Sequence, residues 1–150
     1  MKTKVDFLGL VDSAVRVARG AYPEAILYEG NGIAANGPTA AVRDVDTWRF
    51  VFRVQGGAAL LWSKEWGVFE PMVFTSKPWL EERSAPWPIS MDITEADELL
   101  KLKGCTDPYT TVTLRWPLYP GSDQPYYIFQ TTQNGYVFVG VHDRKVARTE

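Results

Sequence analysis

Residues 47–68 read TWRFVFRVQGGAALLWSKEWGV. Aromatic and branched side chains alternate with charged ones on both sides of a glycine pair, which is the pattern of a β-hairpin. Residues 126–141 read YYIFQTTQNGYVFVGV and repeat this pattern around an Asn-Gly pair. A shift of 78 positions, without a gap, superposes Trp48 on Tyr126. The sequence therefore predicts two related hairpins.

A helix is expected before each hairpin. Apolar residues recur at helical spacing over residues 6–19, and Gly20 supplies a stop signal. A second helix is predicted to open at Thr94, with Asp97 three positions later in a capping-box-like arrangement, and to close at Gly104. Helix and hairpin thus occur twice in the same order.

The other segments complete two units. Extended segments are predicted at residues 25–28, 67–78 and 110–116, whereas residues 29–45 are rich in Gly and Ala and are predicted to form a long loop. Residues 77–90 hold three prolines and two tryptophans, and we expect Trp79 and Trp87 to pack against one of the units.

The economical fold is α+β, with two repeated helix-plus-antiparallel-sheet units that share a curved sheet and keep both helices on one face. The first unit spans residues 1–76, the connector residues 77–90 and the second unit residues 91–150. The three segments are expected to form one compact domain.

Two segments carry a resemblance to known proteins. Residues 91–96, Met-Asp-Ile-Thr-Glu-Ala, open a helix, and the hairpin from Tyr126 closes on Val-Phe-Val-Gly-Val at residues 137–141. This layout resembles PepSY-like domains and the tandem-repeat β-lactamase inhibitor proteins. The resemblance implies protein binding or hydrolase inhibition rather than catalysis. Those inhibitors are secreted and disulfide-bonded, whereas this chain has the single cysteine Cys105.

Composition excludes several classes of function. The net charge is −2 and no run of Lys or Arg occurs, so a nucleic-acid partner is not expected. No apolar run approaches the length of a membrane span, and no signal peptide opens the sequence. A single cysteine suits a reducing compartment, so we expect a cytoplasmic location, with secretion as the alternative if a signal was removed.

Few residues suggest catalysis or a cofactor. Gly30 to Ala35 fits G-x-G-x-x-A, but the break at residues 36–38 leaves no room for the helix that a dinucleotide site requires. His142 and Cys105 have no partners recognisable in the sequence, and their number excludes a Cys/His zinc site. We expect no cofactor and no metal. An acidic cluster is better explained by the helix macrodipole; it consists of Asp92, Glu95, Asp97 and Glu98.

Alternation divides each hairpin into a core face and an outer face. A loop at Gly56-Gly57 would place Phe50, Phe52 and Val54 toward the helices. In the second hairpin the core face is expected to carry Ile128, Val137, Val139 and Val141. The opposite parity carries aromatic, aliphatic and basic side chains, which are predicted to bind a partner: Arg49, Val51, Arg53, Leu60, Trp62, Arg115, Tyr127, Phe129, Phe138 and His142.

These faces favour a non-catalytic module that binds a protein or peptide, with inhibition of an enzyme as one form of that role. Self-association through the same face is a competing interpretation. His142 would make binding sensitive to pH near the ordinary titration range of histidine. A small-molecule ligand is the remaining class of partner.

The alternative is a small cofactor-free lyase, isomerase or cyclase with a curved sheet around an aromatic pocket. Tyr28, Trp48, Trp66 and Asp46 would line that pocket, with Asp46 or His142 as acid or base. A closed cavity of roughly 300 Å³ or more that holds such a group would favour the enzyme. A filled interior with aromatic side chains outside would favour the binding module.

Overall fold

A computed structural model describes residues 6–77, 82–84, 87–117, 124–133 and 135–148. Two α-helices and a short 3₁₀ helix accompany the strands of an antiparallel sheet. The elements are, in order, α1 (Phe7–Ala21), β1 (Ile26–Ile33), η1 (Val42–Asp44), β2 (Thr47–Val54), β3 (Gly57–Ser63), β4 (Val73–Thr75), β5 (Glu82–Arg83), α2 (Ile93–Leu102), β6 (Tyr109–Pro117), β7 (Tyr126–Thr131), β8 (Tyr136–Gly140) and β9 (Val146–Arg148).

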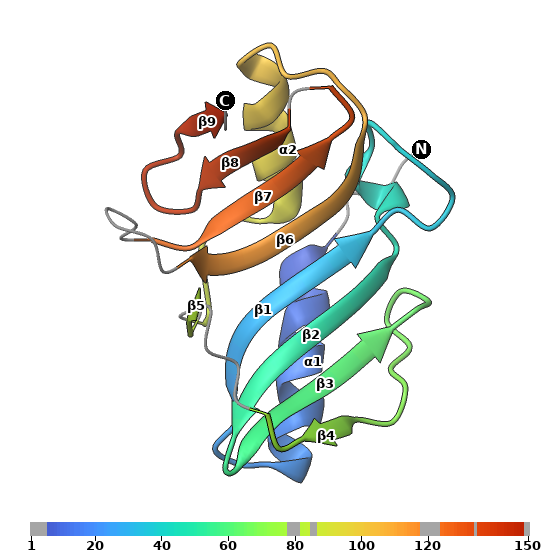
Figure 1. The fold of residues 1–150 in the computed structure, drawn as a ribbon, viewed down its shortest axis with the longest axis vertical. Helices are drawn as coiled ribbons and strands as arrows, with labels where there is room; N and C mark the ends of the chain where they lie inside the picture. The colour runs from blue at the N-terminus through green and yellow to red at the C-terminus, as the bar shows by residue number, and fades with distance from the viewer. Residues whose placement is uncertain (1–5, 78–81, 85–86, 118–123, 134, 149–150) are drawn as a thin grey trace.

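The strands form an open sheet in the order β4-β3-β2-β1-β6-β7-β8-β9, and β5 pairs with the end of β6 beyond β1. Strands β1 and β6 lie at the centre and join the two halves of the chain through antiparallel pairs from Glu29–Arg115 to Ile33–Thr111. Both helices lie behind the sheet in Figure 1, so they cover the same face. The α+β prediction and the placement of both helices on one face are therefore confirmed.

One continuous core lies between the helices and the sheet. It includes Phe7, Val11 and Ala14 of α1, Ala96 and Leu100 of α2, and apolar side chains from the strands of both halves. Both helices are amphipathic, and each turns its buried stripe toward the sheet because that is where its apolar side chains leave water. We call this the inner face of the sheet, and the opposite side its outer face.

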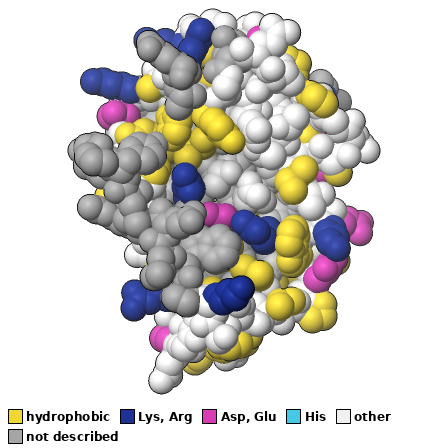
Figure 2. All heavy atoms as spheres, viewed as in Figure 1, with side chains coloured by type: hydrophobic (Ala, Val, Ile, Leu, Met, Phe, Trp, Pro, Cys, Tyr) yellow, Lys and Arg dark blue, Asp and Glu magenta, His cyan; other side chains and the backbone are white. Residues whose placement is uncertain are grey.

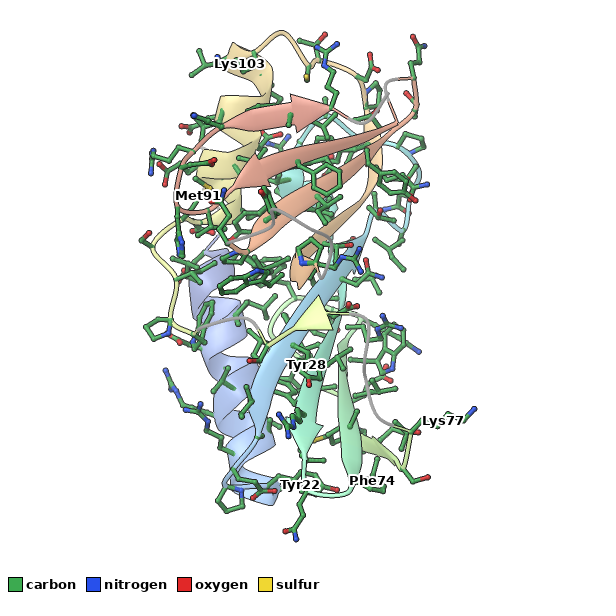
Figure 3. All side chains as sticks on the ribbon, turned by 60° about the vertical axis from the view of Figure 1, so that its left-hand side comes forward. Tyr22, Tyr28, Phe74, Lys77, Met91 and Lys103 are labelled. Carbon is green, nitrogen blue, oxygen red and sulfur yellow. The ribbon has the colours of Figure 1, made fainter. Side chains whose placement is uncertain are left out.

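The first helix is longer than predicted. Gly20 does not end it: α1 continues to Ala21, and the N–H group of Tyr22 donates to the carbonyl of Ala18 at 2.8 Å. The ring of Tyr22 then stacks on Phe74 of β4, with centroids 6.3 Å apart, and Figure 3 shows both side chains at the lower end of the molecule.

The first part of the expected loop at residues 29–45 is strand. Residues 30–33 belong to β1, because the rings of β2 occupy the space above its two glycines. A Cβ atom on Gly32 would lie 2.5 Å from the Trp48 ring, and one on Gly30 would lie 3.0 Å from Phe50. Glycine in these positions is therefore a packing requirement rather than a loop signal.

In the second hairpin the faces of β7 are the reverse of the prediction, whereas Val137 and Val139 of β8 lie in the core as predicted. In the first hairpin Val54 pairs with Gly57, so the loop is Gln55-Gly56 and the predicted parity holds. In the second, the N–H group of Thr131 donates to the carbonyl of Gly135, which leaves three residues in the loop. A change of one residue in loop length turns every side chain of a strand to the other face. The shift of 78 that superposes Trp48 on Tyr126 is therefore wrong.

The start of α2 and the connector also differ in detail from expectation. Asp92, not Thr94, caps α2, since its carboxylate accepts from the N–H group of Ile93 at 2.7 Å. Gly104 follows the helix with φ of 82°, as its predicted stop role requires. Of the extended segment expected at 67–78, the described residues 67–77 form a strand at Val73–Thr75.

The described part of the connector is held to the first helix. The indole N–H group of Trp87 donates to the Asp12 carboxylate of α1 at 2.7 Å, and the ring packs against the core. This contact confirms the predicted packing of Trp87. Trp79 lies outside the described residues.

Replacing Gly32 with Ala should lower the free energy of unfolding by about 1–3 kcal/mol, because the added methyl group would overlap the buried Trp48 ring. Gly20→Ala is the matched control. No atom lies within 4 Å of a Cβ at Gly20 in α1, so this variant should gain roughly 0.5–1 kcal/mol. Urea unfolding of both variants measures the difference, and equal midpoints would contradict the packing role of Gly32.

Candidate functional site

The outer face carries an ion pair in the middle of the sheet. Glu29 of β1 is only 6% exposed, and its carboxylate lies 2.9 Å from the guanidinium of Arg49 on β2. On the other side of β1, Arg115 of β6 occupies the position paired with Glu29. The ion pair with Arg49 compensates part of the cost of removing the Glu29 charge from water, and the register places a second arginine on the neighbouring strand.

A second polar contact continues this row. The hydroxyl group of Thr113 on β6 donates to the side-chain oxygen of Asn31 on β1 at 2.9 Å. Asn31 is also the residue paired with Arg49. The centre of the outer face is therefore a polar row across β2, β1 and β6, which is unlike the inner face.

An apolar patch adjoins the row on β3 and β4. Trp62 is partly exposed, and both the Arg49 guanidinium and the Lys64 ammonium lie over its ring, at 5.9 and 6.0 Å from the centroid. Leu60 follows on the same face and pairs with Val73, which is 51% exposed. We call these five residues the outer-face patch. Figure 2 shows hydrophobic and charged side chains intermixed on this side of the molecule.

Most of the predicted binding residues lie where alternation placed them. Arg49, Val51, Arg53, Leu60, Trp62 and Arg115 lie on the outer face. Phe138 of β8 also lies there, in an edge-to-face contact with Tyr126, with centroids 5.8 Å apart. Val51 has no exposed surface. His142 is exposed in the turn between β8 and β9, apart from the outer-face patch in sequence and topology.

Tyr127 and Phe129 were wrongly predicted to lie on the outer face. Both are fully buried in the core, where Tyr127 pairs with Val139 and Phe129 pairs with Val137. Conversely, Ile128, which was expected in the core, pairs with Phe138 on the outer side and is absent from the core cluster. The loop-length change in the second hairpin causes all three errors.

Tyr127 has a structural hydrogen bond. Its hydroxyl group donates to the carbonyl of Met91, just before α2, at 2.8 Å. Burial, followed by the negative charge of Asp92, raises the pKa of Tyr127 well above its ordinary value. The side chain therefore remains a neutral donor that ties β7 to the start of α2.

Sequence reasoning missed Glu29, Asn31 and Thr113 as a group. The first two fell in the predicted loop because of their glycine neighbours. The alternation Glu29-Gly30-Asn31-Gly32 is in fact a strand signal, with polar residues outward and glycines inward.

The residues expected to line an enzyme pocket do not converge. Trp48 is fully buried in the core, and its indole N–H group donates to the carbonyl of Val45 at 2.9 Å. Tyr28 lies on β1, and Trp66 is 37% exposed in the connection between β3 and β4. No helix begins in the Gly30–Ala35 segment, so this segment lacks the helix N-terminus that a dinucleotide-binding site requires.

Asp46 lies at a separate polar cavity at the rim of the sheet. The cavity has a volume of about 240 Å³ and is lined by Asn36, Gly37, Pro38, Thr39, Asp44 and Asp46. Asp44 accepts a hydrogen bond from the Thr39 hydroxyl group at 2.7 Å. One carboxylate oxygen of Asp46 is buried and has no hydrogen-bond partner among the described residues.

The acidic cluster on α2 has local partners. Asp97 accepts from the Tyr109 hydroxyl group at 2.7 Å and from the Lys101 ammonium at 2.8 Å, while Glu95 pairs with Arg144. Burial, and then the charge of Asp97, raises the pKa of Tyr109 far above its usual range. Within the described ranges, no group of three or more His, Cys, Asp or Glu side chains is arranged to hold a metal ion.

Cys105 is buried. Its sulfur accepts a hydrogen bond from the Nε atom of Arg148 on β9 at 3.2 Å. This contact fixes β9 against the segment that follows α2.

Comparison with known proteins shows the fold alone. The chain is similar to a crystal structure described as a "putative lipoprotein" from Clostridium difficile 630, with a TM-score of 0.68 and 11% identity over 93% of this chain and 91% of that one. No protein-family model matches the chain. No curated protein matches it either. Among the described helices, none has the length and apolar character needed to cross a membrane.

Alanine at Phe129 should lower the free energy of unfolding by about 3–5 kcal/mol, since the ring is fully buried and meets Tyr109 edge-on at 5.0 Å. Phe138→Ala, on the outer side of the neighbouring strand, should cost roughly 1 kcal/mol. Thermal and urea unfolding test this contrast. A larger loss for Phe138→Ala would contradict the observed register.

Proposed function

We propose that the chain is a non-catalytic module that binds a protein or peptide through the outer-face patch. The observation that supports this proposal best is the partly exposed Trp62 between two cations, beside Leu60 and Val73. Trp and Arg are the residues that most often dominate binding energy at protein interfaces. Apolar area there is in contact with water, and its burial would contribute about 25 cal/mol per Å².

The proposed contact set is narrower than the set predicted from sequence. Tyr127 and Phe129 are core residues and are removed from the proposed contact set. Val51 is removed as well, because it has no exposed surface and supports the outer face by packing only. The remaining members are Arg49, Arg53, Leu60, Trp62, Arg115 and Phe138, with Val73 and Lys64 added from the structure. His142 is kept as a peripheral contact only.

Inhibition of a hydrolase is the more specific form of this proposal. It rests on the resemblance to PepSY-like domains and to tandem-repeat β-lactamase inhibitor proteins, together with the antiparallel sheet that has both helices on one side. Self-association through the patch remains the competing form. Sedimentation of the purified protein distinguishes the two forms. Self-association would raise the average mass of the purified protein as its concentration increases, whereas binding to a different protein would not.

A small-molecule or enzymatic role has one observation in its favour. The rim cavity holds two carboxylates, and one oxygen of Asp46 lacks a hydrogen-bond partner among the described residues. Its volume of about 240 Å³ is below the roughly 300 Å³ expected of a ligand pocket. Its lining also lacks Tyr28, Trp66 and His142, so we rank this role second.

We also propose that the two halves are diverged copies of one unit. The support is the element order, in which a helix followed by four strands occurs as α1-β1-β2-β3-β4 and again as α2-β6-β7-β8-β9. The buried rings of Trp48 and Phe50 would then correspond to Tyr127 and Phe129, a shift of 79 in place of 78. No nucleic-acid, membrane or cofactor partner is part of the proposal.

We propose a cytoplasmic location on the basis of the single cysteine, which is buried. The similar structure described as a lipoprotein favours the alternative, a site outside the cytoplasm. Fractionation of the source cells distinguishes them.

The binding role predicts that Leu60→Ala/Trp62→Ala will weaken a purified partner's affinity by roughly 30-fold or more, since hot-spot side chains contribute about 2 kcal/mol. The partner is first captured from source cells by crosslinking and then measured in purified form. Leu102→Ala is the control, because Leu102 is 81% exposed on α2, away from the sheet's outer face. Equal affinity of both variants, with both folded, would reject the patch.

A further inference from the structure

Strand register sorts the outer face of β2, β3 and β4 into three rows that run across the strands. In the first row Arg49 pairs with Trp62. In the second row Leu60 pairs with the exposed Val73. The third row contains Arg53, which is exposed two residues before the hairpin loop. An apolar row therefore lies between two rows that each contain an arginine.

The spacing of the rows matches that of an extended peptide. Successive rows are two residues apart along β2. A strand rises by about 3.3 Å per residue, so the positions of Arg49 and Arg53 are about 13 Å apart along it. In an extended peptide the side chains at i, i+2 and i+4 point to one side with the same spacing. Three such side chains can therefore meet the three rows in turn.

The cations of the first row are held in place by the chain itself. The Arg49 guanidinium is bound at 2.9 Å by the Glu29 carboxylate, which is almost completely buried. After β3, the N–H group of Glu70 donates to the carbonyl of Trp62 at 2.9 Å and closes the following connection onto the strand. Lys64 in this connection lies over the Trp62 ring, and its side chain is 63% exposed. Such preorganisation lowers the cost of ordering side chains when a partner binds.

The charge at the centre of this face is mainly positive, although the whole chain has a net charge of −2. Glu29 is buried, and Glu70, which lies 3.6 Å from Lys64, is less exposed than that lysine. Beside the hairpin loop, Glu24 accepts a hydrogen bond from a backbone N–H group at 3.3 Å. Figure 2 shows Lys and Arg side chains beside hydrophobic ones across the middle of this face, whereas most of the visible Asp and Glu side chains lie toward its margins. The surface therefore complements a negatively charged partner.

We propose that the outer-face patch, together with Arg53, binds an acidic peptide segment in which an apolar residue stands between two carboxylates. This inference rests on the proposed binding role and names the chemistry of its partner. The apolar side chain covers Leu60 and Val73. One carboxylate meets Lys64 and the other meets Arg53. The order of acidic, apolar and acidic side chains at i, i+2 and i+4 follows the order of the three rows.

The same charge disfavours self-association through the patch. In a symmetric dimer the same surface occurs on both sides of the interface, so two basic surfaces would face each other. Like charges that meet across an interface cost free energy. An acidic segment avoids this cost and buries the same apolar side chains.

A phage-displayed library of random dodecapeptides tests the chemistry of the partner. Selection on the wild-type protein, with removal of phage that also bind Leu60→Ala/Trp62→Ala, retains the peptides that depend on the patch. We expect these peptides to carry Asp or Glu two positions before and two positions after an apolar residue. Patch-dependent peptides without net negative charge would overturn this inference and leave the binding role intact. Recovery of no patch-dependent peptide would reject the binding role as well.

Charge reversal locates the contacts of a selected acidic peptide. Its affinity is measured for Arg53→Glu, Lys64→Glu and the control Lys103→Glu, which makes the same change in net charge at the end of α2. Lys103 is exposed at the upper end of the molecule, away from the patch (Figure 3). Each reversal on the outer face should weaken binding by roughly fivefold, because an attraction between exposed charges becomes a repulsion. Equal affinities of the three variants, at unchanged melting temperatures, would overturn the inference.

An anionic lipid surface is the competing partner for a basic patch with an apolar centre. Flotation with vesicles of phosphatidylglycerol and phosphatidylcholine distinguishes the two, and we expect the protein to remain unbound. Flotation of the wild type but not of Leu60→Ala/Trp62→Ala would assign the patch to a membrane and overturn the inference.

Discussion

The packing of the Trp48 ring constrains much of this structure. The ring lies 4.4 Å from the Phe7 ring of α1 and stacks at 6.0 Å on Phe50 of the same strand. Its N–H group is satisfied by the carbonyl of Val45, so this large side chain can be buried without an orphaned donor. The same ring requires glycine on β1. One side chain thus fixes the first helix, the entry into β2 and the composition of the central strand.

The core of the second half is filled by different aromatic side chains. Tyr127 and Phe129 occupy the core of that half, and their partners across the hairpin are the valines of β8. The phenol of Tyr127 needs an acceptor, which the chain provides at Met91, directly before α2. In each half, the buried polar group donates to a backbone carbonyl shortly before a new element begins: Trp48 to Val45 before β2, and Tyr127 to Met91 before α2. These hydrogen bonds fix the connections as well as the core.

Alternation and helical spacing were sufficient to predict both helices, both hairpins and the single-sided arrangement, because these depend on local periodicity. The face of a strand also depends on its register, and register depends on loop length. Gly57 aligns with Gly135 in the sequence, yet the loops differ by one residue, and Tyr127 and Phe129 were placed on the wrong side. The glycines of β1 were misread because the reason for them, two rings on the neighbouring strand, lies about twenty residues away in the sequence.

Part of the candidate site could be predicted for the same reason. Arg49, Leu60 and Trp62 follow from parity within one hairpin. The ion pair of Glu29 with Arg49 and the position of Arg115 opposite Glu29 require the pairing of β1 with both β2 and β6, which no local pattern encodes. The cap at Asp92 was likewise assigned two residues too late, since Thr94 and Asp97 imitate the usual start signal.

The two ends of the sheet limit how a partner can be recognised. The strands that end it, β4 and β9, are each three residues long. Where β3 extends beyond β4, the carbonyl of Trp62 is already bonded to the N–H group of Glu70. Such short edge strands offer little backbone with which an incoming strand could pair, and this protects the protein from edge-to-edge aggregation. They also disfavour recognition by strand addition, so selectivity would have to come from side chains on the broad surface of the sheet.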